Sequence, residues 1–389
     1  MRRTLRHLIY LFFLSLFVPA EAPAAPPQEA GLKPFIGQPA FDAQRVYKKE
    51  RHPNVAIATD GTVLLTLGNS RLLVRRSTDG GKTFGPEIVI ADPGFQAGGL
   101  TVDENTGDVI AFAESGHPPA TLSIYRSTDH GKTWKQQPTK IAPDKHGNTP
   151  SMHMNEHGIT LRHGPNAGRL LRPARFYGAG NRPEEYRNHY TTAIYSDDGG
   201  TSWKTSDPFP ENGTGEATVA ELSDGKVYYN TRCHWDANPQ PTRRRSAVSE
   251  DGGESWKHFE VVEVLPDGLQ HRAYGCMGGL VRLPINGRDI LIFSNIDTEG
   301  EHRERITVWA SFNGGKTWPV KRLVEPGPSA YSSLNAGRPE TPSEGQIYLH
   351  YEAGSGSKLA RFNLAWLLEG EATGDGDVPD TFARGDENL

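Results

Sequence analysis

The sequence predicts an all-β fold, a six-bladed β-propeller, and three observations lead to this prediction. A short motif recurs five times, each copy following a short run rich in β-branched and apolar residues. Glycine-rich turns separate many other short runs, and the 389 residues include 43 Gly and 29 Pro. Only 35% of the residues are hydrophobic, which suits short half-buried strands joined by turns better than long helices.

The recurring motif has the pattern S-x-D-x-G-x-T-W, and we call each copy a box. In "RSTDGGKTF", Asp79 can accept hydrogen bonds from nearby backbone amides, and the glycines tolerate positive φ, so a turn is expected. We expect the closing Trp or Phe to pack under its own hairpin. The last copy has Asn313 in place of the aspartate. The five boxes, spaced 50, 69, 53 and 62 residues apart, begin at Ser77, Ser127, Ser196, Ser249 and Ser311.

Further predicted strand pairs surround turns such as "ATDGTV", "DENTGDV" and "LSDGKV". Units of four strands that repeat about every 50–70 residues are typical of the blades of a β-propeller. Five units carry a box, and a sixth runs from "SAYSSL" to "KLARFNLAWL" without one. The segment before Arg51 is expected to supply the outer strand of the sixth unit and so close the ring. The sequence therefore predicts a single propeller over residues 26–370.

The two ends of the chain are set apart from the propeller. Residues 1–25 begin with basic residues, continue with an apolar run over 8–18 and end in small residues. This pattern indicates a signal peptide and a secreted or periplasmic protein. Because the apolar run is shorter than the ~20 residues of a membrane span, no span is expected after signal removal. Residues 371–389 are acidic and poor in apolar residues, which predicts a flexible tail.

Net charge bears on the kind of partner, and the cysteines bear on disulfide and metal chemistry. The formal net charge is −5 and the basic residues form no long run, which argues against nucleic acid. The two cysteines, Cys233 and Cys276, could form a disulfide in an exported protein or remain as buried thiols. The sequence has no C-x-x-C motif and no histidine-rich metal motif, so neither a metal nor a cofactor is expected.

Charged residues are expected to gather on the face of the propeller opposite the boxes, which we call the site face. Each box lies between the third and fourth strands of a blade. Because successive strands alternate in direction, the first strand of each blade begins at the opposite face. A single arginine at a strand end is usually a solvated surface residue, but convergence from four blades indicates a binding site. The residues placed there are Arg51, Glu216, Arg232, Arg303, Tyr331 and Glu352.

In this pattern the chain resembles the bacterial exo-sialidases (neuraminidases), the Asp-box propeller hydrolases. The resemblance extends from about Arg51 to Leu367 and rests, besides the boxes, on "RHP", "GRLLRPA", "GEATVAELSDG", "HRERITVWAS", "SAYSSL" and "HYEAG" in this order. It implies a retaining hydrolase that removes terminal sialic acid, or a related 2-keto acid sugar, from glycans. It also implies roles for six residues: Arg51, Arg232 and Arg303 as a triad for the substrate carboxylate, Tyr331 as nucleophile, Glu216 as its partner, and Glu352 as the acid that orients Arg51.

These implied roles agree with the chemistry of the residue types. Guanidinium groups offer rigid, always charged paired donors to a carboxylate, and arginines suit this task better than lysines. A carboxylate nucleophile would be repelled by a substrate carboxylate on the anomeric carbon, whereas a neutral tyrosine is not. Sialidases are the known exception to the two-carboxylate scheme of glycosidases. Glu216 would take the phenol proton while Tyr331 attacks, so the two should lie within hydrogen-bond reach.

One feature departs from the resemblance. It implies an acid/base aspartate on the second-to-third-strand loop of the first blade, but this loop is "LGNSRLL", with Asn69 and Ser70 and no acid. The one acid between Arg51 and the first box, Asp60, belongs to a turn on the box face. Glu114, His117 and His52 are the candidates that could replace the aspartate.

Three functions therefore stay open. The first is a secreted sialidase-like hydrolase whose partners are sialylated or other acidic glycans. The second is a catalytically weak propeller that binds acidic sugars, which the missing aspartate supports. The third is a structural propeller that uses its rim for protein contacts, against which the charged site face counts.

Overall fold

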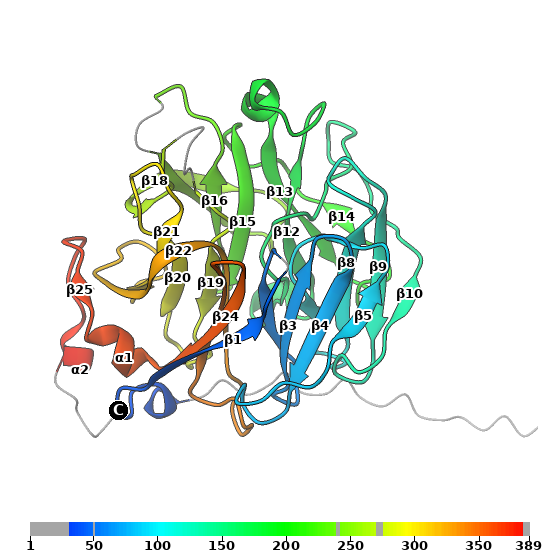
Figure 1. Ribbon diagram of the computed structural model, residues 1–389. Coiled ribbons are helices and arrows are strands. Elements are labelled where there is room, and N and C mark those ends of the chain that lie inside the picture. The colour runs from blue at the N-terminus through cyan, green and yellow to red at the C-terminus, as the bar shows by residue number, and fades with distance from the viewer. Residues whose placement is uncertain (1–30, 50, 239–241, 270–274, 384–389) are drawn as a thin grey trace, which may run out of the picture.

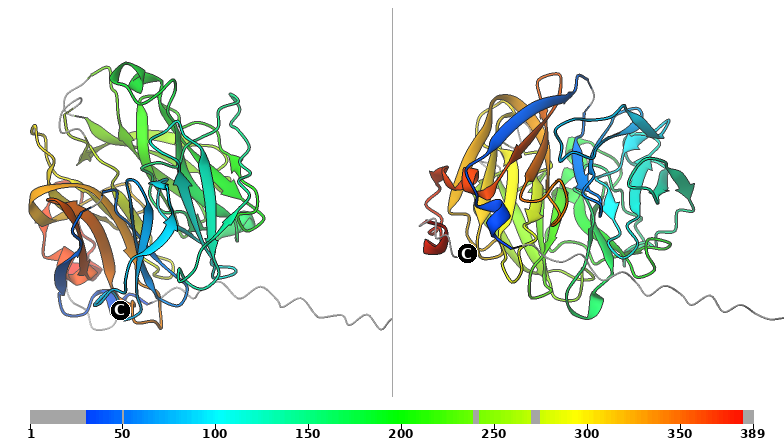
Figure 2. Two further views of the ribbon diagram at one scale, coloured as in Figure 1. Left: turned by 45° about the vertical axis from the view of Figure 1, so that its right-hand side comes forward. Right: turned by 90° about the horizontal axis from the view of Figure 1, so that it is seen from below.

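The structure, a computed structural model, describes residues 31–383 except 50, 239–241 and 270–274. The expected signal peptide at 1–25 and the final residues 384–389 lie outside the described residues. The chain forms an all-β propeller whose sheets stand around a common centre, with few and short helices at the periphery (Figures 1 and 2). Within the described residues, no helix is long and apolar enough to cross a membrane.

Four sheets follow one another along the first two-thirds of the chain, and each is antiparallel. The first contains β2 (Asn54–Ile57), β3 (Val63–Gly68), β4 (Leu72–Ser77) and β5 (Ile88–Ala91). The second contains β6 (Phe95–Gln96), β7 (Thr101–Val102), β8 (Val109–Glu114), β9 (Leu122–Ser127) and β10 (Lys135–Gln137). The third contains β11 (Ile159–Thr160), β12 (Leu170–Phe176), β13 (Tyr190–Ser196) and β14 (Lys204–Thr205). The fourth contains β15 (Thr214–Glu221), β16 (Val227–Cys233), β17 (Arg243–Ser249) and β18 (Lys257–Pro266).

The remaining strands form one eight-stranded sheet. It contains β19 (Gly279–Arg282), β20 (Leu291–Ile296), β21 (Glu304–Ser311), β22 (Val320–Ala336), β23 (Ile347–Ala353), β24 (Gly356–Phe362), β25 (Glu371–Ala372) and β1 (Phe41–Tyr47). The helical elements are the 3₁₀ helices Lys33–Phe35, Gly164–Asn166 and Pro183–Asn188 and the α-helices α1 (Leu364–Leu368) and α2 (Asp380–Ala383).

The prediction of six separate blades is wrong for this last sheet, because the 17-residue strand β22 continues from one set of partners to the next. Its first part pairs with β21 up to Pro328, and its second part pairs with β23 from Ser329 onward. Pro326 and Pro328, which lack an amide hydrogen, lie at this junction, where both ladders have register shifts. The described strands therefore form five hydrogen-bonded sheets.

The N-terminal strand β1 closes the ring as predicted. It pairs antiparallel with β24, from Phe41 opposite Phe362 to Tyr47 opposite Ser357. Figure 1 shows the blue strand β1 beside the orange strand β24, so the two ends of the chain share one sheet.

The five boxes make closely similar hydrogen bonds. In the first, the Ser77 hydroxyl donates to Asp79 Oδ1 (2.6 Å), and Asp79 accepts from the Lys82 amide (3.0 Å) and the Thr83 hydroxyl (2.6 Å). Comparable contacts surround Asp129, Asp198, Asp251 and Asn313. A box is therefore a turn held by its own side chains.

Apolar side chains fill the space between neighbouring sheets. Leu64 and Val74 of the first sheet share one core cluster with Val109 and Ala111 of the second. The closing Trp203 of the third box was expected to pack under its own hairpin. Its ring also lies edge-on against Phe112 of the neighbouring sheet, with 5.5 Å between the ring centres. The box aromatic thus helps to join two sheets.

Part of the segment expected to form a flexible tail, residues 371–383, makes specific contacts with the propeller. The strand β25 pairs with Val320 and Lys321 of β22, and the Trp318 amide donates to Asp375 Oδ2 (2.8 Å). In α2 the ring of Phe382 lies 4.9 Å from that of Phe312. This segment therefore packs against the eight-stranded sheet.

Candidate active site

The six charged and aromatic residues predicted for the site face all lie near the strand ends opposite the boxes. Arg51 precedes β2, Glu216 lies near the start of β15, Arg232 near the end of β16, and Arg303 precedes β21. Tyr331 lies in β22 where this strand begins to pair with β23, and Glu352 lies near the end of β23. Strand direction thus brings residues from distant parts of the sequence to one end of the propeller.

Arg51 is held by Glu352, as the resemblance implies. The Arg51 Nε atom lies 3.2 Å from Glu352 Oε1, and the same oxygen accepts the backbone amide of His52 (3.1 Å). The Arg51 side chain is 53% exposed, whereas Glu352 is 10% exposed. The pair therefore presents a guanidinium to solvent above a fixed carboxylate, which suits the capture of an anion.

Tyr331 lies beside two of the predicted arginines. The guanidinium carbons of Arg303 and Arg51 lie 5.1 Å and 5.4 Å from the centre of its ring. Burial raises the pKa of the Tyr331 phenol, while the positive charges of Arg303 and Arg232 oppose that rise. The phenol is thus kept neutral by its surroundings and is flanked by cations that would stabilise a developing phenolate.

Glu216 is engaged by arginines rather than by Tyr331. Arg232 Nη1 donates to Glu216 Oε2, and Arg175 Nη1 lies 3.6 Å from Glu216 Oε1. Burial alone would raise the pKa of this carboxyl, but Arg232, His234 and Arg175 hold it well below its usual range. In the described part of the chain, no hydrogen bond joins Glu216 to Tyr331. The negative charge of Glu216 nevertheless raises the pKa of Tyr331, because it disfavours the phenolate form.

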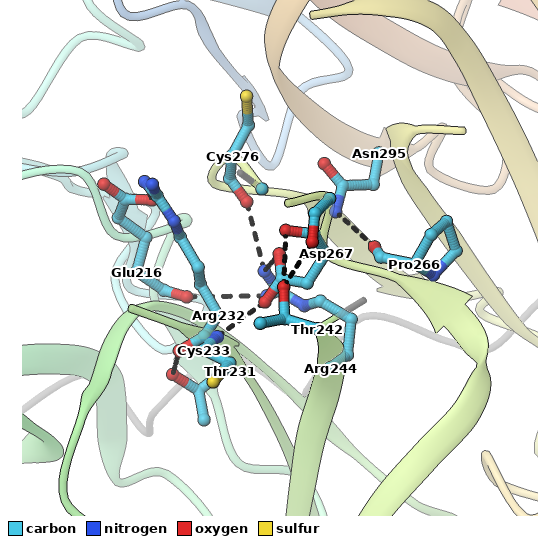
Figure 3. Close-up of polar contacts among 12 residues, drawn as sticks. Glu216, Thr231, Arg232, Cys233, Thr242, Arg244, Pro266, Asp267, Cys276 and Asn295 are labelled. Carbon is cyan, nitrogen blue, oxygen red and sulfur yellow. Dashed lines mark hydrogen bonds and ion pairs between the residues drawn. The ribbon is translucent and has the colours of Figure 1, made fainter. Parts of the chain in front are cut away.

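A buried polar layer supports Glu216 and Arg232 from below (Figure 3). Arg244, on β17, donates to the carbonyl oxygens of Cys276 (3.1 Å) and Glu216 (3.4 Å) and contacts Asp267 Oδ1 (3.4 Å). Asp267 Oδ2 in turn accepts the amide of Cys233 (2.5 Å). The Arg244 and Asp267 side chains are fully buried, so they form a fixed base under two strands that carry site residues. Both cysteines are free and buried.

The loop that lacks an acid makes a different contact. The carbonyl of Gly68, at the end of β3, lies 3.2 Å from Nδ1 of His52, while Asn69 and Ser70 are exposed. The His52 ring is buried and its centre lies 5.7 Å from that of Tyr331. His52 also has a φ of 69°, a conformation that costs a non-glycine residue about 1–2 kcal/mol. The surrounding contacts therefore hold this ring against Tyr331 at some cost in free energy.

The two other candidates for the acid lie elsewhere on the site face. His117 uses both ring nitrogens, Nδ1 with the Pro118 carbonyl (2.9 Å) and Nε2 with Asn181 (3.1 Å). Glu114 Oε1 accepts from the Ser151 hydroxyl (2.6 Å), and burial raises the pKa of its carboxyl to about 7. No contact joins either residue to Tyr331 within the described residues.

Sequence reasoning missed five residues of this region. Four are buried aromatic or imidazole rings near the predicted site, and one is a buried arginine. The arginine lies in the strand "LLRPARF", where the one available signal was a charged residue at a position expected to be in the core. The long loop between β12 and β13 supplies two of the rings. The five residues are His153, Arg175, Tyr177, His189 and His234.

Comparison with known proteins places this chain in a family. Residues 104–348 match the BNR repeat-like domain family, so the chain belongs to the propellers built from such repeats. A sialidase of Micromonospora viridifaciens is 30% identical over 391 residues, which cover 90% of this chain and 57% of that protein. A sialidase of Clostridium perfringens is 28% identical over 327 residues, 74% of this chain and 81% of that protein. The chain is a member of the bacterial sialidase family.

Solved structures agree in fold. The Hadza microbial sialidase Hz136 superposes with a TM-score of 0.63 at 23% identity, covering 82% of this chain and 66% of that one. The intramolecular trans-sialidase from Ruminococcus gnavus, solved with oseltamivir carboxylate, gives a TM-score of 0.62 at 16% identity, covering 90% and 99%. The chain spans little more than half of the Micromonospora sialidase and 48% of a Bacteroides fragilis sialidase.

Proposed function

We propose that this protein is a retaining exo-sialidase-like glycoside hydrolase that removes a terminal sialic acid, or a related 2-keto acid sugar, from glycans. The observation that carries the proposal is the placement of Tyr331 beside both Arg51 and Arg303, with Glu216 close enough to affect its pKa. The family of the chain supports the same class of reaction. Arg51, Arg232 and Arg303 bind the substrate carboxylate in this proposal, and Glu352 orients Arg51.

In the first chemical step, the Tyr331 oxygen attacks the anomeric carbon and the glycosidic bond breaks. The phenol proton passes to the Glu216 carboxylate, and the electron pair of the broken bond stays on the leaving oxygen. In the second step, water attacks the anomeric carbon of the tyrosyl-linked sugar, the bond to the Tyr331 oxygen breaks, and Glu216 returns to that oxygen the proton that it took in the first step. The excess of guanidinium over carboxylate around Tyr331 favours the anionic phenolate that leaves in this step.

His52 is our choice for the group that protonates the leaving oxygen. Its Nδ1 is engaged by the Gly68 carbonyl, so the imidazolium would donate from Nε2, and the Nε2 of the neutral ring would later accept a proton from water. Burial lowers the pKa of His52, and the nearby Glu352 carboxylate opposes that fall. Activity through this group is therefore expected to increase as the pH falls toward the His52 pKa.

The test compares two substrates. His52→Gln should lower kcat/KM on a natural sialoglycan by about 10²–10⁴-fold and much less on an aryl sialoside, whose leaving group needs little protonation. His117→Gln is the matched control, because both nitrogens of that ring are already bonded. Equal losses on both substrates would remove His52 from this role.

We also propose two finer points of organisation. The eight-stranded sheet acts as two blades that share β22, which gives six blades in all, since each half of β22 has its own partners. The basic and apolar character of residues 1–25 supports export to the periplasm or beyond the cell.

A second candidate function is an acidic-sugar-binding propeller with little turnover. It is favoured by the loop at Asn69 and Ser70, which carries no acid, and by Glu216, which is engaged by guanidinium groups. Calorimetry with sialic acid, beside turnover of an aryl sialoside, separates the two. Binding without turnover would support the binding protein and contradict the hydrolase.

A further inference from the structure

Arg175 is a buried arginine on the third sheet that no motif of the sequence singles out. It lies near the end of β12, its backbone exchanges hydrogen bonds with Ser151 (2.8 and 2.9 Å), and its residue is 1% exposed. Its guanidinium lies 4.1 Å from the centre of the Tyr177 ring. Burial of a charge without partners is strongly unfavourable, so its polar contacts indicate its role.

The polar contacts of Arg175 all lie at the candidate active site. Nη1 lies 3.6 Å from Glu216 Oε1, and Nη2 lies 3.2 Å from Nδ1 of His189 and 3.3 Å from Nδ1 of His234. His189 Nε2 lies 3.0 Å from the Gly180 carbonyl and so carries the ring proton, which leaves Nδ1 as an acceptor for Arg175. One guanidinium is thus oriented by two neutral imidazoles and aimed at one carboxylate.

Glu216 is consequently bracketed by two arginines, one on each oxygen. Oε2 accepts from Arg232 and Oε1 faces Arg175. Only Arg232 is among the arginines expected to bind substrate, so Arg175 adds a positive charge that the substrate carboxylate does not need. A planar fork can face a carboxylate and two imidazole nitrogens at once, which a lysine ammonium cannot do with the same geometry.

We propose that Arg175 is a positioning residue that holds Glu216 ionised and correctly oriented beside Tyr331, and that it thereby sets the acid limit of the site. This inference rests on the proposed function in one respect, namely that Glu216 takes part in the reaction. The charged and titratable groups that face Glu216 from the surrounding elements are Arg175, Arg232, His234, Arg244, Asp267, Cys276, Tyr177, Tyr331 and His52.

The first test is the pH dependence of kcat/KM on an aryl sialoside. Arg175→Gln removes the charge, and loss of a neighbouring opposite charge raises a carboxyl pKa by ~1–3 units. The acid limb of the profile should therefore move to higher pH by about one unit or more. Arg175→Lys keeps the charge and should leave the limb near its original position while kcat falls, because the fork is lost.

The control is Arg172→Gln, on the same strand, which also removes a buried charge. Arg172 is also fully buried, but its Nη2 donates to the Ala97 carbonyl (3.1 Å) and its guanidinium lies over Phe112 (4.0 Å). This variant should leave the acid limb in place. An unmoved limb in a folded Arg175→Gln protein, or an equal shift in Arg172→Gln, would overturn the inference.

A second measurement needs no turnover and so separates this inference from the proposed function. Because the folded pKa of Glu216 is depressed, its contribution to stability is lost as the pH falls through that pKa. Acid unfolding of Arg175→Gln should therefore begin at a pH about one unit higher than in the wild type, and Glu216→Gln should abolish the difference. If Arg175→Gln does not fold, His189→Leu, which removes one acceptor of Arg175, should give a smaller shift in the same direction.

The outcomes are distinct. A shift of acid unfolding without any turnover supports Arg175 and contradicts the hydrolase. Turnover with no shift in either measurement contradicts the role of Arg175 and leaves the hydrolase standing.

Discussion

The box face and the site face of this propeller are built from contacts of opposite range. Each box is closed by side chains within a few residues, such as Asp79 with Ser77 and Thr83. On the site face, the amide of His52 donates to Glu352, 300 residues away, and Glu216 meets arginines from two different strands. The difference teaches that local, repeated contacts specify the fold, whereas single long-range contacts specify the chemistry.

The largest expected effect comes from the centre of the site face. Tyr331→Phe removes the nucleophilic oxygen but keeps the ring that packs against Arg51 and Arg303. We expect kcat/KM to fall by about 10⁴-fold or more, while the thermal midpoint and the affinity for free sialic acid stay near the wild-type values. Steady-state kinetics and calorimetry check this. Unchanged turnover would mean that the site face does not carry the chemistry.

The next effect concerns the layer beneath the site. Asp267→Ala would leave Arg244 buried and without its carboxylate, and loss of one partner of a buried ion pair typically costs ~3–5 kcal/mol. Denaturant unfolding should show a loss of this order, and Arg361→Ala, whose partner Asp42 is half exposed, is the surface control. A loss below about 1 kcal/mol would show that the site face tolerates disruption as a surface does.

A smaller effect depends on pH and on Glu114. Burial raises the pKa of this carboxyl from its ordinary value of 4.5 to about 7, so the folded state keeps a proton that the unfolded state loses between these values. The free energy of unfolding should therefore decrease as the pH rises from about 5 to 8, by ~2–3 kcal/mol. Glu114→Gln imitates the protonated form and should lack this decrease. Parallel stability curves for the two proteins would contradict the assignment.

The smallest effect belongs to the box face. Asp129→Ala removes the acceptor for the Thr133 hydroxyl and for two amides of one turn, which is comparable to the loss of a helix cap and should cost ~1 kcal/mol. Turnover should not change, because the box lies at the opposite end of the strands. A loss of activity without a loss of stability would break the division between the two faces.

The box face could be predicted in detail because its contacts are local. The spacing of Ser77, Asp79 and Thr83 within one turn is enough to define their hydrogen bonds. The closing strand β1 also followed from counting strands. The continuity of β22 did not, because no local pattern distinguishes a strand that changes partners from two strands joined by a turn.

For the site face, side-chain chemistry and the family resemblance predicted which residues gather there but not all of the contacts among them. Arg51 and Glu352 do form the expected pair, but the predicted hydrogen bond between Tyr331 and Glu216 is absent from the described part of the chain. Whether Glu216 faces a phenol or a second guanidinium depends on Arg175, which comes from another sheet. Such a choice is made by packing in three dimensions, and the order of residues along the chain does not encode it visibly.

The continuity of β22 has a mechanical consequence for the site. Tyr331 lies within a strand whose two halves are hydrogen-bonded to β21, next to Arg303, and to β23, which carries Glu352. Because one hydrogen-bonded sheet carries these three groups, their relative positions are fixed before a ligand binds. Association should then fit a single exponential whose rate rises linearly with ligand concentration, without the plateau of a slow closing step.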